Sequence, residues 1–377
     1  MSKTVKHILA AVLSLVVLVV AVLGIYVIYL EANYSRIADS TKAEVTATTS
    51  TAGVVNVGQT YTAATYNIGF GAYTPDYTFF MDEGYMADGT KTVGTHSCAV
   101  SKESELSCTN GDISLLSTIN EDGTAPDFIL LQEVDTDSDR SYHVNQRSLI
   151  TDAFPGYTTY FAYNFRSAYL AYPLGEPIGT INSGLLTLSK LRASSSVRRS
   201  YPIDESFPTK FFDLDRCFVV MRYPTSDGHE LVLVNSHMSA YDKGGTVRAR
   251  QLNVISSFIS SEYAKGNYVI VGGDFNHALC GSVDLYESQQ LVPDWVAKLD
   301  STELPEGFSV VQASNLDDVA SCRGDDIPYE KGVTYTVTID GFIVSGNVTA
   351  TTTNVDNGFE YSDHNPVRLT FSLGASA

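Results

Sequence analysis

The sequence predicts an α+β protein in which two packed β-sheets are covered by helices, preceded by one transmembrane helix. Three observations support this prediction. Short apolar runs bounded by turn residues recur along the chain, as buried strands do. Amphipathic helical patterns lie between several of these runs. A segment of 23 residues near the N-terminus, Ile8–Leu30, contains no charged residue.

This N-terminal segment predicts the membrane topology. Residues 1–7 carry Lys3 and Lys6, and a helix over 8–30 at about 1.5 Å per residue crosses a hydrocarbon core of about 30 Å. A cleavable signal peptide has a shorter apolar region, so a signal anchor is favoured. The lysines predict a cytoplasmic tail and a single-pass protein of the cell membrane whose remaining chain is extracytoplasmic.

The rest of the chain is predicted to contain a linker and one domain. Residues 31–53 are rich in Thr, Ala and Ser, which is typical of a stalk. Residues 54–377 have a globular pattern without an internal repeat, and we expect them to form one monomeric domain. The net charge of −19 opposes binding of a polyanion by charge alone.

Strand and helix predictions follow from the apolar patterns. The clearest strands are Phe128–Leu131, Leu231–Val234, Tyr268–Val271 and Gly341–Val344. One helical face contains Leu252, Ile255, Phe258 and Ile259, and Gly266 is a stop signal after it. A second helical face contains Leu115, Leu116 and Ile119.

The five cysteines are compatible with an oxidising compartment. We expect disulfides between Cys98 and Cys108 and between Cys280 and Cys322, although a sequence does not fix connectivity. Cys217 lies in an apolar strand pattern and is expected to be a buried thiol. A zinc site is not expected, because the sequence has no CxxC pair and no clustered histidines.

Polar residues of similar type flank the predicted strands. They are Asn67, Gln132, Glu133, Asn235, His237, Asp274, Asn276, Asp340, Ser362, Asp363 and His364. Ligands often bind at strand ends, where a rigid scaffold opens into loops. Carboxylates, amides and histidines without thiols suit a hard cation such as Mg²⁺ or Mn²⁺. Such a metal, together with acid/base groups, suits hydrolysis of a phosphate ester.

Each of these residues also has a structural explanation when taken alone. Asn67 could end a strand, His237 could be a core histidine, and Asp274 with Asn276 could form an Asx turn. A buried carboxylate at Glu133 is harder to explain, because it needs a partner. The functional interpretation gains weight because all of these residues occur together in one order.

The ordered motifs YNIG, LLQEVD, NSHMSAYD, GGDFNH, TIDGFIVSG and SDHNPV resemble those of the endonuclease/exonuclease/phosphatase superfamily, which includes pancreatic deoxyribonuclease. The resemblance extends from about Tyr61 to Leu373 and points to a membrane-anchored bacterial-type member. It implies a four-layer α/β/β/α sandwich. It also implies a phosphoric ester hydrolase that depends on Mg²⁺ or Mn²⁺.

The resemblance implies a metal site at Glu133, with Asn67 and Asp363 in the same cluster. For substrate binding we name two further candidates. Asn164 is one of three candidates, with Tyr160 and Tyr163, for a residue that supports the histidine or the phosphate in some nucleases of the family. Arg248 lies on a helix near the His237 loop and could contact a phosphate.

The resemblance also implies the catalytic roles. Asp274 would orient or deprotonate the attacking water, and Asn276 would hold a phosphate oxygen. His364, oriented by Asp340, would be the second acid/base group or a donor to the transition state. His237 would contact the phosphate or assist the leaving group. Which residue is the general base stays open.

The predicted function is hydrolysis of a phosphodiester or phosphomonoester, outside the membrane, by in-line attack of an activated water. A phospholipid head group, a nucleic acid and an inositol phosphate stay open as substrates. The aromatic insertion Tyr73–Cys108 is a candidate lid or substrate-choosing loop. The alternatives are a secreted-type nuclease on DNA or RNA and a catalytically silent surface-binding protein on the same fold.

Overall fold

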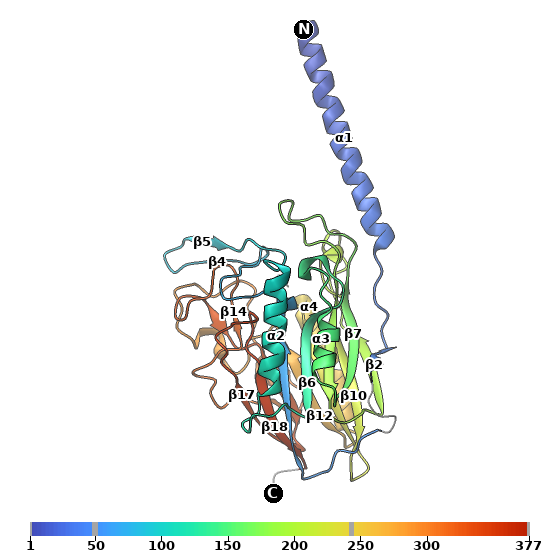
Figure 1. The fold of residues 1–377 in the computed structure, drawn as a ribbon, viewed down its shortest axis with the longest axis vertical. Helices are drawn as coiled ribbons and strands as arrows, with labels where there is room; N and C mark the ends of the chain where they lie inside the picture. The colour runs from blue at the N-terminus through green and yellow to red at the C-terminus, as the bar shows by residue number, and fades with distance from the viewer. Residues whose placement is uncertain (1, 47–51, 241–244, 375–377) are drawn as a thin grey trace.

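The computed structural model describes residues 2–46, 52–240 and 245–374. Two seven-stranded sheets pack face to face, and helices cover their outer faces (Figure 1). We name each sheet after one central strand, as the β12 sheet and the β6 sheet. The predicted sandwich of four layers is therefore confirmed.

The β12 sheet pairs its strands mainly antiparallel, with one parallel pair, β11 and β12. In spatial order its strands are β1 (Thr41–Lys42), β9 (Ser195–Ser200), β10 (Cys217–Pro224), β11 (Glu230–His237), β12 (Tyr268–Asp274), β16 (Asp340–Ser345) and β13 (Phe308–Val310).

The β6 sheet is likewise mixed, and its parallel pair is β3 and β6. In spatial order its strands are β17 (Val348–Asn354), β18 (Val367–Leu373), β3 (Thr60–Asn67), β6 (Phe128–Asp135), β8 (Asn182–Ser189), β7 (Thr158–Arg166) and β2 (Glu44–Thr46). Two short hairpins lie outside the sheets: β4 (Glu83–Tyr85) with β5 (Lys91–Val93), and β14 (Cys322–Arg323) with β15 (Thr336–Val337).

Three apolar layers hold the sandwich together. Between the sheets, side chains such as Phe128, Leu233 and Phe342 are fully buried. Each such side chain contributes about 2 kcal/mol relative to leaving it in water. Helix α4 (Thr246–Tyr263) covers the outer face of the β12 sheet, and α2 (Lys102–Ser117) with α3 (Gln146–Ala153) covers that of the β6 sheet.

The N-terminal helix α1 (Lys3–Asn33) projects from one end of the sandwich, opposite the C-terminus (Figure 1). It has 31 residues and is, among the described residues, the one helix long and apolar enough to cross a membrane. The expected span, residues 8–30, lies within it.

The segment after α1 differs from the predicted stalk. Residues 41–46 form β1 and β2, which pair with β9 and β7 at the edges of the two sheets. Two- and three-residue edge strands are too short to leave a recognisable alternation of apolar residues. Residues 47–51 of the expected stalk lie outside the described residues.

Both expected disulfides are wrong, because all five cysteines are free thiols. Cys108 lies within α2, which begins earlier than expected because Ser101 caps it by accepting a hydrogen bond from Ser104 N. Cys280 packs against the α4 side of the β12 sheet, whereas Cys322 is buried in a separate cluster. Cys217 is buried in β10, as expected.

Candidate active site

The strand registers place the predicted site residues in a row. His237 is the last residue of β11 and lies beside Asp274, the last residue of β12. Asp274 in turn lies beside Asp340, the first residue of β16. Asn67 ends β3 in the facing sheet. Residues that are far apart in the chain thus meet at one end of the sandwich.

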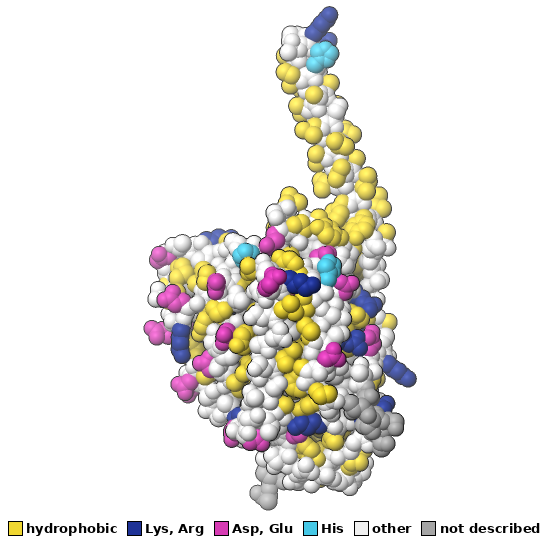
Figure 2. Space-filling view, viewed as in Figure 1, with side chains coloured by type: hydrophobic (Ala, Val, Ile, Leu, Met, Phe, Trp, Pro, Cys, Tyr) yellow, Lys and Arg dark blue, Asp and Glu magenta, His cyan; other side chains and the backbone are white. Residues whose placement is uncertain are grey.

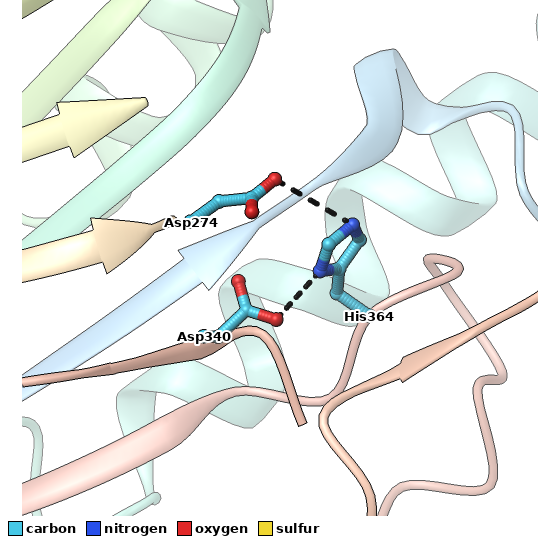
Figure 3. A group of neighbouring side chains, drawn as sticks. All are labelled: Asp274, Asp340 and His364. Carbon is cyan, nitrogen blue, oxygen red and sulfur yellow. Dashed lines mark hydrogen bonds and ion pairs between the residues drawn. The ribbon is translucent and has the colours of Figure 1, made fainter. Parts of the chain in front are cut away.

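His364 completes this row from the loop before β18. Its Nδ1 lies 2.7 Å from Asp340 Oδ2, and its Nε2 lies 3.9 Å from Asp274 Oδ2 (Figure 3). Ser321 Oγ donates to the same Asp340 oxygen at 2.8 Å, which holds the carboxylate in place. Burial acts to lower the pKa of His364, but the Asp340 charge outweighs it, and the pKa is raised well above its ordinary value. The imidazolium form is therefore favoured at neutral pH.

Asp274 is buried and tightly held. Its Oδ2 accepts from Asn67 Nδ2 at 3.1 Å, and its Oδ1 accepts from Asn276 N at 2.8 Å. Burial, and then the Asp340 charge, raise its pKa to about 7, against the opposing effect of His364. A carboxylate with this pKa can accept a proton near neutral pH, as a general base must.

Glu133 reaches the site through a β-bulge. The register of β6 against β8 shifts between Leu131 and Val134, and Glu133 has a φ of 56°. Gln132 points between the sheets, where it donates to Asn235 Oδ1 at 2.8 Å. The bulge thereby turns the next side chain, Glu133, into the cavity that it lines.

The donor set at this point fits a divalent cation. The carboxylates of Glu133 and Asp363 line the cavity floor with the amide of Asn67, whose Nδ2 lies 3.4 Å from Glu133 Oε1. These are hard oxygen donors of the type that Mg²⁺ and Mn²⁺ prefer. Burial raises the pKa of Glu133, and the nearby Asp363 charge adds to this effect. A bound cation would offset both effects.

The structure adds Arg216, which the sequence interpretation missed. Its Nη1 donates to His237 Nε2 at 2.6 Å, and its buried Nε has no hydrogen-bond partner among the described residues. Burial, and then the Arg216 charge, lower the pKa of His237, so this imidazole is neutral. Arg216 lines the cavity. Its position at the start of an apolar strand carried no signal of this role.

Arg140 is a second cation at the cavity. It forms a bidentate ion pair with Asp135, at 2.9 and 3.0 Å, and its guanidinium lies 3.8 Å from the centre of the Phe70 ring. Because Asp135 ends the bulged strand β6, this pair braces the segment that carries Glu133.

The two predicted substrate-binding residues lie apart from the cavity lining. Asn164 is fully buried at a bulge of β7. Arg248 donates to the carbonyls of Ala240 and Trp295, at 3.1 and 2.8 Å. On this helix Arg250 lines the cavity instead. Asn276 also lines it and donates to Met238 O at 2.9 Å.

The cavity above these residues has a volume of about 610 Å³, a polar floor and an apolar wall. Its floor is polar and contains Asn67, Glu133, Arg216, His237, Asp274, Asn276, Asp363 and His364. One wall is apolar and contains Phe79, Phe80, Phe165, Leu170, Ile178 and Phe212. Phe79 and Phe80 belong to the aromatic insertion. A substrate in this cavity would meet charged groups at one end and hydrocarbon at the other.

Comparisons with known proteins agree with this architecture. A sequence profile of the Endonuclease/Exonuclease/phosphatase family matches residues 64–364. No curated protein matches the chain. Three solved structures share the fold at low identity, and they are an endonuclease/exonuclease/phosphatase from Beutenbergia cavernae DSM 12333, TDP2 from C. elegans, and ANGEL2, a 2′,3′-cyclic phosphatase solved with adenosine-2′,3′-vanadate.

The three alignments cover most of each chain. The Beutenbergia protein has a TM-score of 0.55 and 13% identity over 84% of this chain and 72% of its own. TDP2 has a TM-score of 0.50 and 15% identity over 84% and 76%. ANGEL2 has a TM-score of 0.50 and 15% identity over 83% and 96%. Because the profile matches residues 64–364, which are most of the chain, the chain belongs to the Endonuclease/Exonuclease/phosphatase family and is a phosphoric ester hydrolase.

Proposed function

We propose that this protein is a divalent-metal-dependent phosphodiesterase, anchored by α1, that acts outside the membrane. One observation carries the proposal. Asp274, with its raised pKa, and His364, held by Asp340, lie side by side on the polar floor of a large cavity, with 3.9 Å between Asp274 Oδ2 and His364 Nε2. This arrangement places a base and a cationic hydrogen-bond donor together at one phosphate.

The chain's own groups account for activation of the attacking water and for a cationic donor to the phosphate. Asp274 accepts a proton from a water that attacks phosphorus in line. His364 donates a hydrogen bond from Nε2 to a phosphoryl oxygen, while Asp340 stabilises its positive charge through Nδ1. The departing alkoxide takes its proton from solvent. The Asp340–His364 pair thereby fixes the orientation of the imidazolium.

Fixed donors around the cavity stabilise the charge that develops on the phosphoryl oxygens. Arg216 has a buried Nε without an acceptor among the described residues, and Asn276 lines the same floor. Such pre-oriented donors are worth most where water is excluded. His237, neutral beside Arg216, keeps the guanidinium in position.

Glu133, Asp363 and Asn67 would hold the metal. A bound Mg²⁺ or Mn²⁺ supplies Lewis-acid stabilisation of a phosphoryl oxygen and orients the ester. The Glu133 carboxylate is kept ready for this role by the bulge in β6 and by the Asp135–Arg140 pair.

The test uses the full chain in detergent. A truncated chain is avoided because residues 41–46 contribute β1 to one sheet and β2 to the other. Hydrolysis of bis(p-nitrophenyl) phosphate is measured with Mg²⁺, with Mn²⁺ and with a chelator. We expect chelator-sensitive activity that falls by about 10²-fold or more in Asp274→Asn, as loss of a general base does. Asp356→Asn, an exposed substitution, is the matched control. A folded protein without hydrolysis would favour the silent surface-binding protein instead.

A further inference from the structure

The end of α1 is attached to the catalytic domain by specific contacts. Tyr26 Oη donates to Tyr169 O at 3.1 Å and accepts from Ala171 N at 2.9 Å. Tyr29 Oη accepts from Tyr169 N at 3.1 Å. Leu30 is 5% exposed and packs into the domain. The loop that follows β7 therefore lies level with the last turns of the apolar helix.

The same loop exposes large apolar side chains. Tyr172 is 57% exposed and Leu174 is 87% exposed, and neighbouring Phe207 is 60% exposed. Phe207 contacts Phe211, which packs with Leu30 in one cluster. In Figure 1 the β7–β8 loop rises beside the foot of α1, and Figure 2 shows hydrophobic side chains gathered there. We call Tyr169, Tyr172, Leu174 and Phe207 the membrane face.

The catalytic floor opens toward this end of the molecule. Strand β18 begins beside His364 and runs to the C-terminus, which lies at the opposite end from α1 (Figure 1). The site is therefore at the α1 end. A helix that spans the bilayer would hold the site directly against the membrane surface.

The apolar wall of the cavity is continuous with the foot of the helix. Leu30 belongs to a buried cluster whose members Phe165, Leu170, Ile178 and Ile181 also line the catalytic cavity. Phe80, on the same wall, contacts Tyr172 with ring centres 5.7 Å apart. Hydrocarbon surface thus extends from the lipid-facing helix to within the site.

From this continuity we infer that the substrate is a phospholipid taken from the bilayer in which α1 is anchored. The acyl chain lies along the wall of Phe165, Leu170 and Ile178, and the phosphodiester lies on the polar floor. A water-soluble polyanion would gain nothing from this wall and would meet a chain of net charge −19. Tyrosines at a helix end lie at the level of lipid head groups, as Tyr26 and Tyr29 would here.

The inference rests on the proposed phosphodiesterase function and specifies its substrate class. In the reaction the oxygen of water bonds to phosphorus and one P–O ester bond breaks. The alcohol leaves with a proton, and a phosphomonoester stays as the other product. No further reactant is required.

The test compares three substrates with the full chain and Mg²⁺. They are vesicles of equal parts phosphatidylcholine, phosphatidylethanolamine, phosphatidylglycerol and sphingomyelin, into which the protein is reconstituted, then a single-stranded oligonucleotide, and bis(p-nitrophenyl) phosphate. We expect phosphomonoester or free alcohol release from at least one vesicle lipid and no cleavage of the oligonucleotide.

Two variants test the membrane face. Leu174→Asp places a charge on a side chain that does not line the cavity, and Val57→Asp places one at the C-terminal end of the sandwich as the matched control. Burial of one leucine shifts an equilibrium by a factor of roughly 10 to 100, so we expect Leu174→Asp to lower lipid hydrolysis by about tenfold. Its hydrolysis of bis(p-nitrophenyl) phosphate should match that of Val57→Asp.

The outcomes separate the two proposals. If the folded wild-type protein hydrolyses none of the three substrates, the proposed phosphodiesterase function is wrong. Hydrolysis of bis(p-nitrophenyl) phosphate without that of any vesicle lipid would overturn only the lipid inference, and oligonucleotide cleavage would replace it by a nuclease. Lipid hydrolysis that is equal in Leu174→Asp and Val57→Asp would remove the membrane face from substrate capture.

Discussion

At the scale of single residues, the site depends on two carboxylates with different partners. Asp340 is tied to His364 and Ser321, whereas Asp274 is tied to two amide groups. The Asp340 charge favours protonation of both His364 and Asp274. One carboxylate thus raises the pKa of both side chains, in addition to the effect of burial on Asp274.

The first prediction concerns the acid limb of the pH–rate profile. Because burial and the Asp340 charge raise the pKa of Asp274 to about 7, this base is protonated below pH 7 and ionised above it. We expect kcat/KM for bis(p-nitrophenyl) phosphate to fall about tenfold per pH unit below that point. Activity that persists unchanged down to pH 5 would mean that another group is the base.

The second prediction concerns Asp340→Asn. The change removes the charge that raises the pKa of His364, so burial dominates and the pKa falls. The imidazolium then loses its proton at a lower pH, so the alkaline limb of the pH–kcat profile should shift to lower pH. The maximal kcat should also fall by roughly 10²- to 10⁴-fold. NMR titration of His364 separates this positioning effect from unfolding. An alkaline limb at the same pH as in the wild-type protein would contradict this prediction.

The sequence allowed site residues to be predicted where a residue type, such as a carboxylate beside a buried strand, has few structural explanations. Glu133, Asp274 and His364 lie at or near strand ends and line one floor in the structure, and Asp340 lies directly behind His364. Arg216 was missed, because an arginine at the start of a strand is usually solvated. Its role depends on contact with His237, which lies 21 residues away in the chain.

At the scale of elements, the β6 bulge is the feature that delivers the proposed metal ligand. Three interactions hold this bulge in place. Gln132 forms hydrogen bonds between the sheets, Gln146 Oε1 accepts a hydrogen bond from Asp135 N, and Asp135 forms an ion pair with Arg140. The sequence predicted the strand but not the bulge, because a bulge is a matter of register with β8. Apolar alternation in one strand carries no information on its partner.

The third prediction tests this brace. Asp135→Asn leaves the buried Arg140 guanidinium without its counter-charge, and the pair is almost fully buried. Breaking such a pair costs about 3–5 kcal/mol, so the free energy of unfolding in urea should fall by that amount. The Mg²⁺ concentration for half-maximal activity should also rise. Asp137→Asn, whose carboxylate is 75% exposed, is the control and should change neither quantity.

At the scale of the whole molecule, the order of motifs allowed the sandwich to be predicted, but not the path of the chain from the membrane to the sandwich. The linker composition of residues 31–53 suggested a free stalk. Instead, residues 36–46 run along the domain and add a strand to each sheet. Such contacts are made by backbone groups and by partners distant in sequence, which composition does not record.

The contacts of this segment give the last prediction. Buried Arg198 donates to the carbonyls of Ile37 and Ala38, at 3.5 and 3.3 Å, and Asp215 forms an ion pair with Arg36. A fragment that begins at Val54 lacks these partners, whereas one that begins at Tyr34 keeps them. Each buried polar group left unpaired costs about 1–3 kcal/mol.

We therefore expect the fragment from Val54 to unfold at a lower urea concentration than the fragment from Tyr34, with a deficit of roughly 2–5 kcal/mol from two or three lost partners. Arg198→Met in the shorter fragment should recover only part of that deficit, because it also removes the bonds to Tyr163 O and Asp215 O. If both fragments unfold at the same urea concentration, residues 34–46 are a tether after all, and the catalytic end of the sandwich is free to tilt away from the membrane.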